Sequence, residues 1–176
     1  ASVQARLGST RLPGKVLLHL GDHRILQWVC KRTETATCVD QTIAAIGDQP
    51  ENEAIIEYCE RENIQTIVDS EDNLLTRHIT VAEQTDCDLL VRITGDCPFV
   101  PPDEIDRVVS EHMSSDARYT TNHTDVGGTI RRVVRDVAPT AVVDREVEQP
   151  VDIFGRFGRE TPLFQVPVID VNTCRV

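Results

Sequence analysis

Apolar and polar positions follow two alternating periods along the first 120 residues. Short runs rich in β-branched and small apolar residues occupy residues 1–4, 42–46, 65–68 and 88–93, each long enough for a buried strand. Between these runs, apolar residues recur at spacings of three and four, which is typical of a helix with one buried face. The three helical stripes are Ile25, Leu26, Val29 and Cys30; Ala54, Ile55, Tyr58 and Cys59; and Leu74, Leu75, Ile79 and Ala82.

A further helix is predicted after the fourth strand. Its signals, in chain order, are the prolines Pro101 and Pro102, the first-turn acids Asp103 and Glu104, and the apolar face of Ile105, Val108 and Val109. Regular alternation of strands and helices implies right-handed crossovers. We therefore predict an α/β fold with a mostly parallel, Rossmann-like sheet and helices on both faces.

After Tyr119 this alternation stops. The remaining chain holds β-branched runs at 130–134, 141–143 and 164–169, separated by the glycines and prolines of turns. We expect these runs to form a small β-rich C-terminal extension packed on the parallel part. The chain of 176 residues is long enough to bury one core. We predict a single domain over residues 1–176, with a βα part at 1–120 and a divergent part at 121–176.

The charge of the chain narrows its possible partners and surroundings. Acids outnumber bases by 29 to 18, for a net charge of −11, and Lys15 and Lys31 are the only lysines. No broad basic face is available for a phosphate backbone, so we expect no nucleic-acid partner. The apolar runs are short and no secretory signal is visible, so we expect a cytoplasmic protein without a membrane partner. Salt would screen so many carboxylates, which indicates a halophilic habitat.

Six cysteines are spread along the chain without the spacing of a zinc site or a disulfide framework. They are Cys30, Cys38, Cys59, Cys87, Cys97 and Cys174. We expect most of them to be small buried apolar residues.

The first 21 residues are positively charged, opposite in sign to the chain as a whole, because they contain no acid but hold Arg6, Arg11 and Lys15. The loop at 4–15 follows the first strand, at the sheet edge where open α/β sheets bind ligands. Gly8 and Gly14 allow close approach of an anion, and Ser9 and Thr10 add hydrogen-bond donors. This combination predicts a polyphosphate site; the alternative is an ordinary glycine-containing loop with solvated bases.

A candidate metal ligand follows the fourth strand, in the run Thr94-Gly-Asp-Cys-Pro98. Asp96 lies at the same predicted sheet edge as the basic loop, where its carboxylate suits Mg²⁺ bridging phosphate oxygens. A simple turn before the proline is the alternative. The acidic pair Asp86 and Asp88 precedes that strand, so we expect it at the opposite edge.

The loop at 4–15 resembles the signature loop of the sugar-acid cytidylyltransferases, above all their spore coat polysaccharide biosynthesis protein F branch, and the Thr-Gly-Asp-Cys-Pro run is similar as well. The resemblance implies that Arg6, Ser9 and Lys15 contact the nucleotide phosphates and that Asp96 holds Mg²⁺. It places Gly8, Thr10, Arg11 and Thr94 in the same nucleotide site, with Arg6, Lys15 and Asp96 as the catalytic groups. Residues 69–77 resemble the family's cytosine and ribose segment, which suggests roles for Ser70 and Arg77; the alternative is helix capping and a surface ion pair.

The family resemblance implies an enzyme that transfers CMP from CTP to a sugar acid, releases pyrophosphate, serves surface polysaccharide biosynthesis and forms a homodimer. The tail departs from the family pattern. Where the family has Gly-x-Asp-x-Glu, residues 127–131 place Thr129 and Arg131 at the acidic positions, although a register shift would bring in Asp125 or Asp136. Residues 145–149 also retain little of the family's Glu-Arg-Glu-His-Val segment. The alternative function is therefore a catalytically impaired nucleotide- or nucleotide-sugar-binding protein.

Overall fold

The computed structural model describes residues 1–115, 119–122, 131–132 and 168–171, with backbone only for the last two segments. The predicted strand at 141–143, the tail residues Asp125, Thr129 and Asp136, and Cys174 lie outside these residues.

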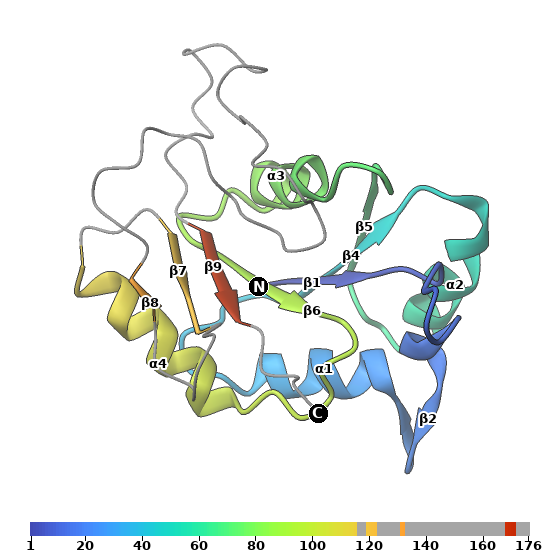
Figure 1. The fold of residues 1–176 in the computed structure, drawn as a ribbon, viewed down its shortest axis with the longest axis horizontal. Helices are drawn as coiled ribbons and strands as arrows, with labels where there is room; N and C mark the ends of the chain where they lie inside the picture. Colours follow the sequence, from blue (N-terminus) through green and yellow to red (C-terminus); the bar gives the residue numbers. More distant parts are fainter. Residues whose placement is uncertain (116–118, 123–130, 133–167, 172–176) are drawn as a thin grey trace.

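The described strands form one main sheet in the order β5-β4-β1-β6-β9-β7-β8 (Figure 1). Their bounds are β1 Ser2–Ala5, β4 Ile43–Gly47, β5 Thr66–Asp69, β6 Leu90–Thr94, β7 Tyr119–Thr121, β8 Arg131–Arg132 and β9 Val168–Val171. Every neighbouring pair is parallel except β7 and β8. The predicted mostly parallel α/β sheet is confirmed, with each of the first four strands displaced by one or two residues toward the C-terminus.

The tail contributes to this sheet in a way that the sequence pattern did not indicate. Strand β9 lies between β6 and β7 and runs parallel to both, so the tail inserts into the sheet rather than only packing against it. Strand β7 was not predicted, and β8 lies at the edge of the described sheet. Pairing between segments so far apart in sequence depends on long-range contacts, which local periodicity does not record.

Helices cover both faces of the sheet, as expected. The helix bounds are α1 Ile25–Glu34, α2 Glu53–Arg61, α3 Leu74–Thr85 and α4 Pro102–Met113, with 3₁₀ turns η1 Lys15–Leu17 and η2 Pro50–Asn52. Helices α1, α2 and α4 pack on one face and α3 on the other (Figure 1). A small hairpin of β2 His19–Leu20 and β3 His23–Arg24 precedes α1 and was not predicted. None of the helices that the structure describes is long and apolar enough to cross a membrane.

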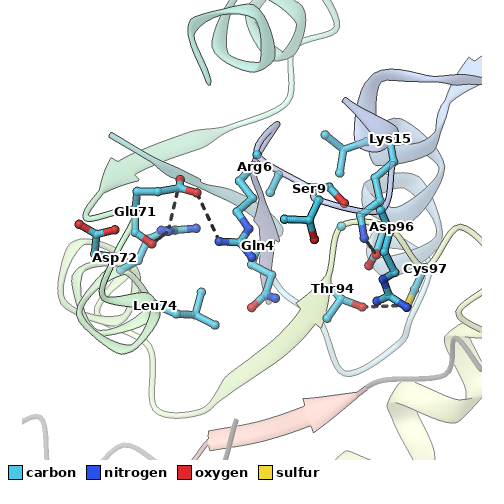
Figure 2. Close-up of a pocket in the computed structure, with 17 residues that line it drawn as sticks. Gln4, Arg6, Ser9, Lys15, Glu71, Asp72, Leu74, Thr94, Asp96 and Cys97 are labelled. Carbon is cyan, nitrogen blue, oxygen red and sulfur yellow. Dashed lines mark hydrogen bonds and ion pairs between the residues drawn. The ribbon is translucent and has the colours of Figure 1, made fainter. Parts of the chain in front are cut away.

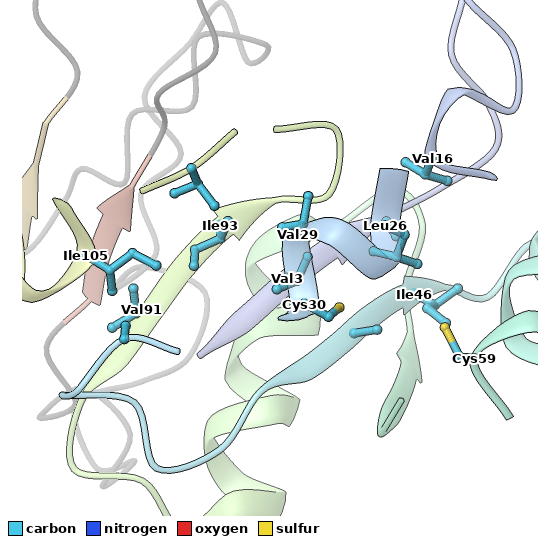
Figure 3. Close-up of a cluster of buried hydrophobic side chains, with 14 of the residues drawn as sticks. Val3, Val16, Leu26, Val29, Cys30, Ile46, Cys59, Val91, Ile93 and Ile105 are labelled. Atoms are coloured by element: carbon cyan, nitrogen blue, oxygen red, sulfur yellow. The ribbon is translucent and has the colours of Figure 1, made fainter. Parts of the chain in front are cut away.

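The main core lies between the sheet and α1, α2 and α4 (Figure 3). Val3, Leu26, Val29, Ile46 and Ile93 are fully buried there. Because side chains alternate along a strand, Val3 of β1 faces this core while its neighbours face α3. The stripes predicted for α1, α2 and α4 contribute to this core, except for Ala54 of α2, which is exposed. The stripe predicted for α3 is wrong: Leu74, Leu75 and Ile79 are only partly buried, and the buried face of this helix is formed by Arg77, His78, Val81 and Ala82.

The opposite face of β1 carries a buried polar cluster beneath α3. Ser2 Oγ lies 2.7 Å from His78 Nδ1, and Gln4 Oε1 lies 3.4 Å from His78 Nε2. Arg92 Nε donates to the same Gln4 oxygen at 2.9 Å. Burial lowers the pKa of His78 to about 3, and the charges of Arg92 and Arg77 act in the same direction. The cluster therefore fits a neutral imidazole that accepts from Ser2 and donates to Gln4.

We expect this histidine to make the fold sensitive to acid. The folded pKa of His78 lies below the ordinary value of 6.5. Below that pH the unfolded chain therefore binds a proton at His78 that the folded protein does not bind. Its stabilising contribution is complete above the unfolded pKa and is lost as the pH falls toward the folded one. For one proton the free energy of unfolding should fall by about 1.4 kcal/mol per pH unit in that window.

Urea unfolding at neutral and at mildly acidic pH measures this slope. His78→Gln should reduce it, while His19→Gln, at an exposed histidine, should leave it unchanged. Part of the slope should persist in His78→Gln, because burial also lowers the pKa of His112. An unchanged slope in His78→Gln would show that another group controls the acid response.

Candidate functional site

A cavity of about 490 Å³ opens at the carboxyl ends of β1, β5 and β6. Its lining includes all but one of the predicted nucleotide-site residues: Arg6, Gly8, Ser9, Thr10, Arg11, Lys15, Arg77, Thr94 and Asp96. Ser70 is the exception. The position agrees with the sheet edge at which open α/β folds bind ligands. The basic loop after β1 and the turn after β6 therefore share one cavity, as the sequence predicted.

The loop after β1 turns back on itself through backbone hydrogen bonds. The Leu7 carbonyl oxygen accepts from the N–H groups of Ser9 and Gly14, at 2.7 and 3.1 Å. Gly14 has φ of +69°, a conformation that glycine adopts without the steric cost of a Cβ atom. This turn brings Lys15 back to the cavity, although it lies ten residues after Ala5, the end of β1.

Lys15 and Asp96 meet at one side of the cavity (Figure 2). Lys15 Nζ contacts Asp96 Oδ2, and both side chains are about one-third exposed. The turn that carries Asp96 packs directly on β1, because Gly95 N–H donates to the Gln4 carbonyl oxygen at 2.8 Å. A Cβ atom at Gly95 would lie 2.5 Å from that oxygen, so a side chain there would displace the turn. Next to Asp96, Thr94 Oγ1 lies 2.8 Å from Cys97 Sγ.

The other side of the cavity holds a carboxylate between two guanidinium groups. Glu71 lies in the loop between β5 and α3, 3.6 Å from Arg6 Nη1 and 3.8 Å from Arg77 Nη2. The Arg6 side chain is 47% exposed, whereas that of Arg77 is 3% exposed. Figure 2 shows Arg6 extending toward Glu71 and Lys15 toward Asp96, with Ser9 between them. Glu71 was not predicted, although it lies inside the 69–77 segment.

Arg77 and Ser70 organise the loop after β5. Arg77 Nη2 donates to the carbonyl oxygens of Ser70 and Glu71, at 2.8 and 3.0 Å. Ser70 Oγ accepts from Asn73 N–H at 3.1 Å, and Asn73 in turn caps α3. Arg77 is 2% exposed, so the alternative of a surface ion pair is wrong for this residue. The capping alternative is wrong for Ser70 as well, because Asn73 caps α3 and the Ser70 hydroxyl holds the loop before the helix.

Two further sequence predictions can be placed in the structure. Asp86 caps the C-terminus of α3 and Asp88 precedes β6, so this acidic pair lies at the opposite sheet edge, as expected. Of the five cysteines that the structure describes, Cys30, Cys59 and Cys97 are buried, as expected, whereas Cys38 and Cys87 are only partly buried. Burial raises the pKa of the Cys59 thiol to about 12, which makes it a poor nucleophile at neutral pH.

Comparison with known proteins identifies relatives of this chain. The sequence model described as cytidylyltransferase matches residues 1–152, further than the 120 residues over which a resemblance was expected. The spore coat polysaccharide biosynthesis protein SpsF of Bacillus subtilis is 33% identical over 122 residues, which cover 67% of this chain and 51% of that protein. A 3-deoxy-manno-octulosonate cytidylyltransferase of Synechococcus elongatus is 33% identical over 132 residues, covering 73% and 51%.

A solved structure of a cytidylyltransferase shares this fold. A cytidylyltransferase from Leptospira borgpetersenii superimposes with a TM-score of 0.62 at 28% identity, covering 68% of this chain and 52% of that one. The chain spans about half the length of the curated relatives it matches, 51% in both proteins above. The family model covers residues 1–152, a range that includes every residue lining the cavity.

Proposed function

Because the chain belongs to the cytidylyltransferase family, we propose that it transfers CMP from CTP to a sugar acid and releases pyrophosphate. The observation that carries the proposal is the single cavity that unites Arg6, Lys15 and Asp96 at the ligand-binding edge of the sheet. The similarity to SpsF and to an octulosonate cytidylyltransferase supports a sugar-acid acceptor and a place in surface polysaccharide biosynthesis.

In the proposed reaction the anomeric hydroxyl oxygen of the sugar acid attacks the α-phosphorus of CTP in line. A sugar-oxygen to phosphorus bond forms as the hydroxyl proton passes to water, and the bond from the α-phosphorus to the bridging oxygen breaks, so pyrophosphate leaves with the electron pair. Lys15, Arg6 and Arg11 lie in the cavity as cations for the phosphate oxygens. Such reactions are accelerated mainly by positioning and by charge stabilisation, which these side chains can supply.

The Lys15–Asp96 contact indicates an order in which the triphosphate and a divalent cation would bind. In the structure the two side chains neutralise each other. A triphosphate would compete with the carboxylate for the Lys15 ammonium, because phosphate oxygens make strong charge-assisted hydrogen bonds. Asp96 would then be left with its negative charge beside the bound phosphates, where a divalent cation is favoured.

The residues present fit a magnesium ion, which we propose as the cofactor. No group of three or more His, Cys, Asp or Glu side chains suited to a metal occurs among the residues that the structure describes. Mg²⁺ commonly uses one or two carboxylates together with substrate phosphates, so Asp96 alone suffices as the protein ligand. Its oxygen already faces a cation, the Lys15 ammonium. When bound, the ion would withdraw charge from the departing pyrophosphate.

A second candidate is a protein of the same fold that binds the nucleotide or nucleotide sugar without turnover. It is favoured by the presence of Thr129 and Arg131 where the family resemblance predicts acids. We also propose that the protein forms a homodimer, as the family resemblance implies, and that it works in a salt-rich cytoplasm, since salt would screen the net charge of −11.

Pyrophosphate release separates the two candidates. The protein is incubated with Mg²⁺, with each nucleoside triphosphate in turn and with a panel of sugar acids. We expect release only when CTP and a sugar acid are both present. Saturable CTP binding without pyrophosphate for any acceptor would support the second candidate instead. Absence of binding to every triphosphate and to every CMP-sugar would overturn both.

A further inference from the structure

Asn52 lies behind the cavity, at the end of η2, and is fully buried. Its Oδ1 accepts from the N–H of Leu7, at 2.8 Å. Its Nδ2 donates to the Gly47 carbonyl oxygen at 3.0 Å and to Glu71 Oε2 at 2.9 Å. One side-chain amide therefore joins the segments that follow β1, β4 and β5, which are neighbours in the sheet.

The chemistry of these contacts is specific to a primary amide. An asparagine side chain offers one acceptor oxygen and two N–H donors, and the three partners of Asn52 require this set. A carboxylate of the same shape would keep the bond to Leu7 N–H but would lose both donors. It would also place a second negative charge next to Glu71, in a buried position where charge repulsion is strong.

Glu71 links Asn52 to the cavity, because its carboxylate contacts both Asn52 and Arg6. Its carboxylate lies 3.6 Å from the Arg6 guanidinium, which extends over the cavity (Figure 2). The close approach depends on Gly47, because a Cβ atom there would lie 1.6 Å from Glu71 Oε2 and 3.1 Å from Asn52 Nδ2. Gly47, Asn52 and Glu71 thus form a contiguous support beneath Arg6.

We propose that Asn52 is a positioning residue for the nucleotide site. It holds the Glu71 carboxylate in place, and that carboxylate orients Arg6 toward the triphosphate. It also ties the start of the basic loop, at Leu7, to the same support. This inference rests on the proposed function, since Arg6 is taken to contact CTP. Asn52 itself does not line the cavity and touches no substrate in this proposal.

Isothermal titration of Mg·CTP into the whole chain tests the proposal. We expect Asn52→Asp to weaken binding by about 10-fold or more, because two buried hydrogen bonds are lost and a like charge is added. Asn63→Asp is the matched control: the same chemical change at an exposed residue beyond the other end of α2 should leave the Kd unchanged. Circular dichroism confirms that each variant is folded at the assay temperature.

Glu71→Gln distinguishes positioning from a general loss of structure. In the Asn52→Asp background it removes the charge repulsion and restores a donor opposite the new carboxylate. We expect it to weaken CTP binding in the wild type, because Arg6 loses its carboxylate partner, and to weaken it less or to tighten it in the Asn52→Asp background. An equal effect of Glu71→Gln in both backgrounds would overturn the proposal, as would wild-type affinity of Asn52→Asp.

Gly47→Ala provides a second route to the same test if Asn52→Asp does not fold. Its methyl group displaces the Glu71 carboxylate without adding a charge, so CTP binding should again weaken by about 10-fold. Wild-type affinity in this variant would overturn the proposal. If the wild-type chain itself fails to bind CTP, the proposed function fails instead, so the two failures are distinguishable.

Discussion

Asp96→Asn should lower the rate of pyrophosphate release by roughly 10²- to 10³-fold, the loss typical when one preorganised charge stabiliser is removed. The asparagine amide keeps the size of the side chain but is a far weaker partner for Mg²⁺. It also leaves Lys15 without the carboxylate that it contacts in the structure. CTP affinity in the absence of Mg²⁺ should therefore be retained or increased, while the stimulation of turnover by Mg²⁺ disappears.

Asp103→Asn serves as the control for this change. Asp103 is an exposed carboxylate in the first turn of α4, seven residues further along the chain. Steady-state pyrophosphate release should be within about two-fold of wild type for Asp103→Asn, as for most exposed substitutions. If Asp96→Asn turned over CTP as fast as this control and kept its Mg²⁺ dependence, Asp96 would not be the metal ligand.

Lys15→Ala should weaken CTP binding by about 10- to 100-fold, as expected for the loss of a charged hydrogen bond contributing about 1.5–3 kcal/mol. The substitution removes the cation that the folded loop after β1 brings back to the cavity. It should also leave Asp96 more available to Mg²⁺ in the absence of nucleotide. Equilibrium binding of CTP and of Mg²⁺, each titrated alone, measures both effects.

The chain contains a well-matched control for Lys15, because Lys31 is its other lysine. Lys31 is exposed on α1 and does not line the cavity. Lys31→Ala removes the same charge and should leave the CTP dissociation constant within about two-fold of wild type. Equal affinities of Lys15→Ala and Lys31→Ala would mean that net charge, and not the position of Lys15, governs nucleotide binding.

Local sequence information was sufficient for the βα framework and for the position of the basic loop. Strand β4, for example, is a run of small and branched apolar residues, and all its residues are buried in the sheet. The absence of acids from residues 1–21 marked the loop, because this charge inversion is visible without any coordinates. The carboxyl ends of parallel strands share one edge, so Lys15 and Asp96 were expected to meet there.

The supporting residues of the site were not recognised for equally specific reasons. Glu71 was inside a segment already considered, yet an acid beside a predicted phosphate site looks unfavourable until Arg6 and Arg77 are seen on either side of it. Asn52 belongs to no motif, since its partners are 45, 5 and 19 residues away. A surface ion pair was the alternative role for Arg77, because the spacing of residues on a mainly polar helix does not show that one arginine is buried.

Hydrophobic periodicity and local charge thus specify strands, helices and a basic loop, because these properties involve residues a few positions apart. The folded chain specifies which distant residues meet: the insertion of β9 between β6 and β7, the neutral His78 beneath β1, and the bridge from Asn52 to Glu71. Each of these depends on burial and on directional hydrogen bonds between segments that only the assembled sheet brings together.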